Sequence, residues 1–349
     1  MRLERRADVP VYLVAVAPLA AIAVALLLGS FLIGLAGVSP LTAYNHLLAG
    51  AFGSKLAITE TLTRATPLIL TGLAAAVAFR CKLWNIGGEG QFYVGALISA
   101  WLGHSIVVGL PFPLAIIIIL ASGMAVGALL LAGPALMRLN FGVDEVVTTL
   151  LLNFVVILFV GLMIEGPMRD PLAFGWPQSV PVDRSLRLPD LVDRSRLHVG
   201  LLIALGAALV VWLVLARTRF GLESRAVGFN SRAASFAGIS LPSTILGTAF
   251  LSGGLAGLAG AVEVLGVTGN VTTTLSPGYG YSGIVVAMLA ALHPLGVVAA
   301  AVFVATVFVG ADSMARATGV PSFIADVIMS VSLLCMLVAL LFTSYRLRR

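Results

Sequence analysis

Residues 11–37 decide the fold class, because VYLVAVAPLAAIAVALLLGSFLIGLAG runs for 27 residues without a formal charge. A helix needs about 20 predominantly apolar residues to cross the hydrocarbon core of a bilayer, so this run is long enough to span it. The apolar region of a cleaved secretory signal is only about 7–15 residues long. The run therefore predicts a retained first membrane span.

The composition of the whole chain agrees with that prediction. Of its 349 residues, 60% are hydrophobic and only 10% are charged, and the mean hydropathy is +1.08. A soluble domain carries about 25% charged residues, so this chain has too few to cover a surface that faces water. Cationic residues that flank and orient spans explain the net charge of +6 without a nucleic-acid partner. We expect an all-α integral membrane protein with one transmembrane domain over 1–349.

Hydropathy and the charged breaks predict about ten transmembrane helices. Their expected bounds are 11–37, 57–79, 86–106, 112–137, 144–164, 198–216, 241–263, 281–292, 295–314 and 322–343. Short loops rich in Arg and Lys face the cytoplasm, and their positions place both termini inside. This topology makes 166–197 an extracytoplasmic loop and puts the basic segment 217–240 in the cytoplasm.

Two of the apolar stretches are interrupted where they begin. Asn85-Ile86-Gly87-Gly88-Glu89-Gly90-Gln91 stands at the mouth of the third span, and Ser276-Pro277-Gly278-Tyr279-Gly280 precedes an unusually short eighth span. Transporters use such discontinuous helices to hold solutes near the membrane midplane, where irregular backbone must lie against protein or water. Residues 71–75 also echo 252–256, which suggests an inverted repeat of spans 2–5 and 7–10.

Small residues recur at every fourth position in the seventh span. These residues are Ala249, Gly253, Gly257 and Ala261. Such a stripe lets the backbone of another helix approach closely. We interpret the stripe as a packing surface.

Several polar or aromatic side chains in the spans could line a substrate pathway. They are Asn85, Glu89, Gln91, Phe92, Asn153, Glu60 and Arg64. Glu60 and Arg64 share a helix face, so they either neutralise each other or support the pathway. Glu89 either shapes the pathway or caps a half-helix, and Asn153 could instead join two helices by hydrogen bonds.

Other site chemistry has weaker support. The four histidines are isolated, with no metal-ligand spacing, and Cys81 and Cys335 lie in or beside apolar runs, so we expect no metal site. Gly280-Tyr281-Ser282-Gly283 matches the serine motif of rhomboid-type intramembrane proteases, which makes proteolysis by Ser282 an alternative. The only later histidine is His293, about 16 Å away if both lie on one helix, too far to take the serine proton.

Several separated motifs resemble one family of transporters. Ala233-Ala234, followed by Gly238, is similar to the EAA-type coupling segment of ABC importer permeases, with Arg232 where the usual pattern has Glu. The segments 85–91, 152–153, 166–167, 225–239, 280–284 and 293–296 resemble the nucleoside and simple-sugar branch of these permeases. This branch is part of the branched-chain amino acid and ribose-type permease superfamily. The resemblance covers about residues 57–345, although Gly88 stands where the family motif has a bulkier aliphatic residue.

The resemblance implies a permease subunit of the bacterial inner membrane that imports a nucleoside or related sugar-containing solute by alternating access. It implies as partners a second homologous permease subunit in a heterodimer, a cytoplasmic ABC ATPase and an extracytoplasmic substrate-binding protein. The chain has no phosphate-binding GxxxxGK[ST] loop, so we expect no cofactor in it and ATP-Mg in the ATPase. An ion-coupled secondary transporter is the alternative.

The resemblance also places contact with the ATPase in the basic cytoplasmic segment. The residues it assigns to coupling are Glu223, Arg225, Gly228, Asn230, Arg232, Ala233, Ala234 and Gly238. We expect one short helix from about Ser224 to Ala237, framed by Gly221 and Gly238, that rests in a groove of the ATPase. Arg232 puts in question any role for a carboxylate at its position. A basic loop that only holds the topology is the alternative.

Overall fold

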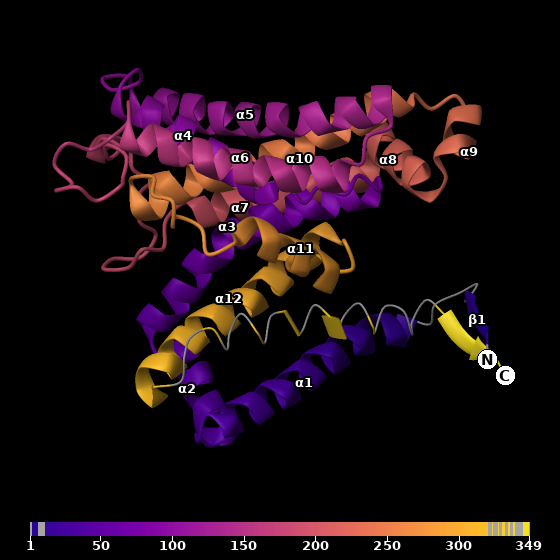
Figure 1. Cartoon of the computed structure of the whole chain (residues 1–349), viewed down its shortest axis with the longest axis horizontal. Helices are drawn as coiled ribbons and strands as arrows, with labels where there is room; N and C mark the ends of the chain where they lie inside the picture. The colour runs from indigo at the N-terminus through magenta and orange to yellow at the C-terminus, as the bar shows by residue number, and fades with distance from the viewer. Residues whose placement is uncertain are drawn as a thin grey trace. The chain divides into compact units, whose positions relative to one another are not determined.

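The computed structural model is built almost entirely of helices (Figure 1). It describes residues 2–5, 11–319, 323, 327, 330–331, 334–335, 338 and 345–348. In chain order the elements are β1 (Arg2–Arg5), α1 (Val11–Leu35), α2 (Pro40–Phe52), α3 (Lys55–Arg80), α4 (Gly88–His104), α5 (Phe112–Phe141), α6 (Glu145–Glu165), η1 (Arg184–Leu186), α7 (Gly200–Arg217), α8 (Arg219–Phe229), α9 (Ser231–Phe236), α10 (Leu241–Glu263), η2 (Val264–Thr268), α11 (Tyr279–Leu289), α12 (Pro294–Thr318) and β2 (Tyr345–Arg348). The predicted helical class is confirmed, and the pairing of β1 with β2 is an addition that the sequence pattern did not predict.

Within the described part of the chain, six helices are long and apolar enough to cross a membrane: α3, α5, α6, α7, α10 with η2, and α12. The pair α1 and α2, bent by 116° at its break, adds a seventh candidate. The chain is therefore a multi-pass membrane protein, but ten spans are not confirmed. The predicted spans 86–106 and 281–292 are shorter helices, α4 and α11, because the backbone before each is unwound. The predicted span 322–343 lies mostly outside the described residues.

The chain divides into two compact units. The first contains residues 1–61 and 302–349, and the second contains residues 62–301. In the first unit, Ile33, Leu47 and Met314 belong to a small buried apolar cluster. The boundaries between the units fall within α3 and α12, so each of these helices contributes residues to both units. The single transmembrane domain over 1–349 therefore stays a prediction. The second unit holds most of the candidate site residues.

The core of the second unit forms where α10 packs against α5 and α4. A Cβ atom at Gly253 would lie 3.0 Å from the Cα of Ala128, and one at Gly127 would lie 2.9 Å from the Cα of Gly257. These gaps are too small for a side chain next to backbone, so glycine lets the two helices approach. The packing interpretation of the small-residue stripe is confirmed.

The loop 166–197 and the helices α8 and α9 lie at opposite ends of the second unit (Figure 1). The loop is held by backbone hydrogen bonds to the segment that follows α10. The amide of Ser179 donates to the carbonyl of Val271 (2.9 Å), and that of Leu188 donates to the carbonyl of Leu265 (3.0 Å). An ordered loop at the end opposite the basic segment is consistent with the predicted topology.

His198 anchors the end of this loop. Its buried ring lies against Gly200 and Gly266, where a Cβ atom at either position would collide with the ring. Nδ1 accepts a hydrogen bond from the amide of Gly200 (3.0 Å), and Nε2 has no hydrogen-bond partner among the described residues. Burial lowers the pKa of His198 from 6.5 to about 4, an effect that the charge of Asp190 partly opposes. The ring is therefore neutral near pH 7.

Candidate substrate pathway and coupling segment

Two broken helices bring their N-termini together. α4 begins at Gly88 and α11 begins at Tyr279, each after irregular backbone, and the two ends touch through Gly280. A Cβ atom on Gly280 would lie 2.5 Å from the Cα of Glu89 and 2.5 Å from the carbonyl carbon of Gly88, so only glycine fits. The N-terminus of a helix carries a partial positive charge, and two such ends therefore face one small region. The predicted helix breaks are present.

Glu89 lies between these two N-termini and is buried. Its Oε2 accepts a hydrogen bond from the amide of Gly280 (2.7 Å), and its carboxylate also bonds the Ser276 side chain and the Tyr281 amide. Ser276 Oγ in turn accepts from the amide of Tyr279 (2.8 Å). Glu89 thus belongs to the first turn of α4 and caps α11. Of the two sequence interpretations, this conformation displays the capping one.

Asn85 and Gln91 form a closed pair of side-chain amides. Asn85 Nδ2 donates to Gln91 Oε1 (2.9 Å) and Gln91 Nε2 donates to Asn85 Oδ1 (2.9 Å). Asn85 Nδ2 also donates to Ser252 Oγ (3.1 Å) on α10, whose hydroxyl donates to the carbonyl of Ala74 (2.7 Å) on α3. The amide of Gly87 donates to Asn85 Oδ1 (2.9 Å). This buried network fixes the unwound backbone between α3 and α4.

Asn153 joins α6 to the same region. Its Oδ1 accepts from the amide of Gly90 (2.8 Å), and its Nδ2 donates to the carbonyl of Ile86 (2.9 Å) and to the Tyr281 hydroxyl (3.1 Å). Asn153 is fully buried, whereas Tyr281 is partly exposed. The structure thus shows the interhelical bonding that was one of the two interpretations of Asn153. Tyr281 is a site residue that sequence reasoning had noted only as part of the protease motif.

Phe92 lies in the core beneath this network. It is fully buried and packs against Tyr93, with ring centroids 5.9 Å apart, and against Tyr279 at 5.8 Å. The Tyr93 hydroxyl donates to the carbonyl of Thr273 (2.8 Å) and accepts from the amide of Ser276 (3.2 Å). In this conformation Phe92 supports the site from behind, so its contact with a solute stays a prediction.

Glu60 and Arg64 lie one turn apart on α3, and both are partly buried. Both side chains take part in polar or electrostatic interactions. The helical spacing expected from the sequence is present. Their part in the substrate pathway stays a prediction.

The basic segment forms two helices, so the prediction of one helix from Ser224 to Ala237 is wrong. Asn230 has an extended backbone (φ −156°, ψ 105°) that separates α8 from α9. Its Oδ1 accepts a hydrogen bond from the amide of Ala233 (3.1 Å) and caps α9. Asn favours such caps because its side chain satisfies an amide that has no partner within the helix. The segment is therefore a jointed pair of short helices.

The glycines in the basic segment have distinct roles. A Cβ atom at Gly228 would overlap the carbonyl of Arg80 at the end of α3, so glycine lets α8 touch that helix end. Gly238 has φ +84°, a left-handed conformation that glycine adopts readily, and it follows α9. Arg225, Arg232 and Ala233 are exposed, while Ala234 is buried. Glu223 lies 3.6 Å from Arg219 in a largely exposed ion pair.

Comparison with known proteins decides the family. A model of the permease component of branched-chain amino acid transport systems matches residues 57–340. The chain belongs to this permease family. The permease is 35% identical over 328 residues to a guanosine ABC transporter permease protein of Bacillus subtilis, with 91% of each chain covered. It is 34% identical to a nucleoside ABC transporter permease protein of Lactococcus lactis, with 89% of this chain and 87% of the relative covered.

A glucose ABC transporter permease protein of Haloferax volcanii is 32% identical over an alignment of 356 positions, which covers 99% of the permease and 93% of the relative. A second guanosine ABC transporter permease protein of Bacillus subtilis and a second nucleoside ABC transporter permease protein of Lactococcus lactis also match, at 27% and 25% identity. No solved structure matches the permease significantly. The family resemblance seen in the sequence is confirmed.

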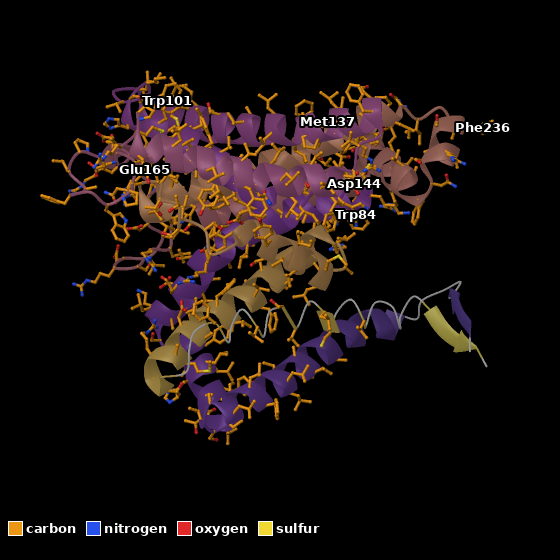
Figure 2. The ribbon with its side chains drawn as sticks, in the orientation of Figure 1. Trp84, Trp101, Met137, Asp144, Glu165 and Phe236 are labelled. Carbon is orange, nitrogen blue, oxygen red and sulfur yellow. The ribbon has the colours of Figure 1, made fainter. Side chains whose placement is uncertain are left out.

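Two features of the permease were missed or misjudged from sequence. Phe229 on α8 and Phe236 on α9 expose most of their apolar surface, and Phe236 lies at one end of the second unit (Figure 2). Hydropathy averaged over a basic segment does not reveal two such side chains. The estimate of about 16 Å between Ser282 and His293 assumed one helix, but α11 ends at Leu289 and His293 precedes α12, where its Nδ1 accepts a hydrogen bond from the amide of Gly296 (3.4 Å).

Proposed function

We propose that this permease is the membrane-spanning subunit of an ATP-driven importer that moves a nucleoside, or a related sugar-containing solute, into the cytoplasm. The observation that carries the proposal is the 35% identity with a guanosine permease over nine tenths of both chains. Similarity to a glucose permease along nearly the whole chain supports the inclusion of sugars in the substrate class.

The candidate site suits a neutral solute rich in hydroxyl groups. Asn85, Gln91 and Asn153 supply amide donors and acceptors, and Tyr281 adds a partly exposed aromatic ring with a hydroxyl. Ligand sites commonly combine apolar walls with a few such polar groups. The two helix N-termini are already balanced by the carboxylate of Glu89, so a solute need not bring a negative charge.

The close contacts in the second unit support an inverted repeat. The first helix of one half, α3, touches the second helix of the other half, since a Cβ atom at Gly283 would lie 2.7 Å from Thr71. Reciprocally, α10 touches α4, where a Cβ atom at Gly95 would lie 2.6 Å from the Cα of Gly257. A pseudo-twofold axis relating spans 2–5 to spans 7–10 would generate both contacts. The pairing of β1 with β2 favours placing both termini on one side, which we take as the cytoplasmic side.

An ATPase groove is the proposed binding partner of α8 and α9. Exposed Phe229 and Phe236 supply apolar anchors, and exposed Arg225 and Arg232 supply charged contacts around them. Because Gly228 presses α8 against the end of α3, movement of the ATPase would reach the unwound segment before α4. In this proposal the ATPase binds and hydrolyses ATP-Mg, and this chain holds no cofactor.

The remaining partners follow from the paired relatives. Two permease proteins match from each nucleoside system, which supports a second, homologous permease subunit and a heterodimer. We also propose an extracytoplasmic substrate-binding protein that delivers the solute, and a location in the bacterial inner membrane.

The test is transport by the assembled complex in vesicles. The permease, its partner subunit, the ATPase and the binding protein are reconstituted, and accumulation of radiolabelled guanosine, other nucleosides and glucose is measured. ATP-dependent accumulation of one of these solutes that survives an ionophore is the expected result. Uptake that needs no ATP and collapses with the ionophore would indicate an ion-coupled transporter instead. Replacing Ser282 with Ala should leave uptake nearly intact.

A further inference from the structure

A cavity of about 290 Å³ lies between the last turn of α6 and the loop that follows it. Its lining residues are Ile164, Glu165, Arg169, Gly175, Trp176 and Pro177. It lies at the opposite end of α6 from Asp144, near the end marked by Glu165 and Trp101 (Figure 2). The cavity is therefore separate from the network around Asn85 and from the coupling segment.

The loop over this cavity is a hydrogen-bonded hairpin, residues 169–179, which we call the outer hairpin. The amide of Asp170 donates to the carbonyl of Gln178 (3.1 Å), and Gln178 Nε2 donates to Asp170 Oδ2 (2.9 Å). Asp170 Oδ1 accepts from the amide of Leu172 (2.9 Å), which fixes the turn. The hairpin is thus held by Asp170 and Gln178, and it does not require the side chains of Arg169 or Trp176.

Glu165 and Arg169 bring opposite charges to the wall of one cavity. Within the described part of the chain, neither side chain makes a hydrogen bond or an ion pair, so the two do not bond each other. Two separated and opposite charges are complementary to a ligand that carries both a cation and an anion. Trp176 adds an aromatic ring, which attracts cations through its face.

The surface below the cavity fits acyl chains. α6 exposes a stripe of apolar side chains at helical spacing that leads toward Glu165. The stripe consists of Leu151, Val155, Leu158 and Leu162. The tip of the outer hairpin, residues 171–177, has no charged residue and exposes Leu172, Phe174 and Trp176. Tryptophan is enriched where the acyl region meets the headgroups, and the cavity lies at the end of the apolar helix α6, so both features are consistent with an opening at headgroup depth.

We propose that this cavity binds the headgroup of an aminophospholipid, with its phosphate on the guanidinium of Arg169 and its ammonium between the carboxylate of Glu165 and the ring of Trp176. A phosphate and a primary ammonium can each form a charge-assisted hydrogen bond to these groups. The apolar stripe on α6 favours a lipid over a soluble zwitterion. This assignment needs only a chain that lies in a membrane, and it does not depend on which solute is transported.

The test measures quenching of Trp176 by lipids with bromine near the headgroup end of the acyl chains. The full-length chain is reconstituted in vesicles containing equal fractions of brominated phosphatidylethanolamine or brominated phosphatidylglycerol. Subtraction of the Trp176→Phe spectrum isolates the signal of Trp176 from that of the other tryptophans. We expect phosphatidylethanolamine to quench Trp176 about two- to fivefold more effectively, as exposed charge pairs contribute modestly.

Matched variants assign the preference to the cavity. Glu165→Gln should abolish the preference for phosphatidylethanolamine, and Arg169→Ala should weaken quenching by both lipids. Asp193→Asn and Arg184→Ala alter exposed charges elsewhere in the loop 166–197 that do not line the cavity, and they should change nothing. All four side chains are exposed, so these variants should fold, which size-exclusion chromatography checks.

Three results would overturn the assignment. The first is equal quenching by the two lipids in the unaltered chain. The second is a preference that survives Glu165→Gln. The third is protection of Trp176 from both lipids in the assembled transporter, which would show that a protein partner covers the outer hairpin.

Discussion

Replacing Gly280 with Ala tests whether the meeting of two helix N-termini supports transport. The new Cβ atom would lie 2.5 Å from the Cα of Glu89, about 0.9 Å inside the 3.4 Å of an ordinary van der Waals contact. Its neighbours are backbone atoms, so α4 and α11 must separate. Forcing a methyl group into a packed core costs about 1–3 kcal/mol, and the higher helix propensity of Ala recovers up to about 1 kcal/mol.

The expected result is a melting temperature lower by about 2–8 °C, from a net cost of about 1–2 kcal/mol at about 2–4 °C per kcal/mol for large domains. Uptake should also fall, by more than the small loss of stability explains, because separation of α4 from α11 lengthens the hydrogen bond from the Gly280 amide to Glu89. Thermal unfolding of the purified chain and guanosine uptake by the reconstituted complex measure the two effects. Gly161→Ala on α6 is the control, since a Cβ atom there has no atom within 4 Å. Wild-type melting and uptake in Gly280→Ala would refute the proposed close packing.

Four further predictions concern single sites. Glu89→Gln keeps one hydrogen-bond acceptor but places an NH2 group next to two helix N-termini, so uptake should drop while expression persists. Unchanged uptake would show that transport does not need the carboxylate of Glu89. Gly228→Ala should push α8 away from the carbonyl of Arg80 and leave ATP hydrolysis running without uptake, whereas normal coupling would contradict the contact. Phe236→Ser should weaken copurification of the ATPase without lowering the melting temperature, because the side chain is 98% exposed; retained copurification would place the ATPase elsewhere. The free energy of unfolding should fall as the pH drops from 6.5 toward 4, by about 2 kcal/mol at pH 5, because His198 is protonated in the unfolded chain before it is protonated in the folded one. Melting curves of His198→Gln should show a weaker pH dependence. An unchanged pH dependence in this variant would show that His198 is not its cause.

The sequence predicted well whatever depends on apolar runs and on small residues. Long apolar stretches located α3, α5, α6, α7, α10 and α12, because a helix in lipid must be long and apolar. The four-residue stripe in 241–263 located the contact of α10 with α5, since only small side chains allow that approach. Glycine-rich polar stretches located the breaks before α4 and α11.

Details that depend on tertiary contacts escaped the sequence. The split at Asn230 arises because its side chain caps α9, which competes with continuing α8, and residue propensity does not decide between the two. Glu89 was recognised as unusual, but its partner Gly280 is 191 residues away, so capping and pathway roles stayed equal alternatives. Phe92 was assigned to the substrate pathway because it follows the 85–91 motif in the sequence, but its side chain lies in the core.

The pairing of the Asn85 and Gln91 amides with each other has a consequence for how a solute binds. In this conformation both amides are occupied by partners within the chain, and the oxygen of Asn85 serves two donors. A solute that forms hydrogen bonds with these side chains must first break the hydrogen bonds that they make within the chain. Binding of a solute and opening of the unwound segment before α4 would then occur together. A solute whose hydrogen bonds are weaker than those between the Asn85 and Gln91 amides would not bind.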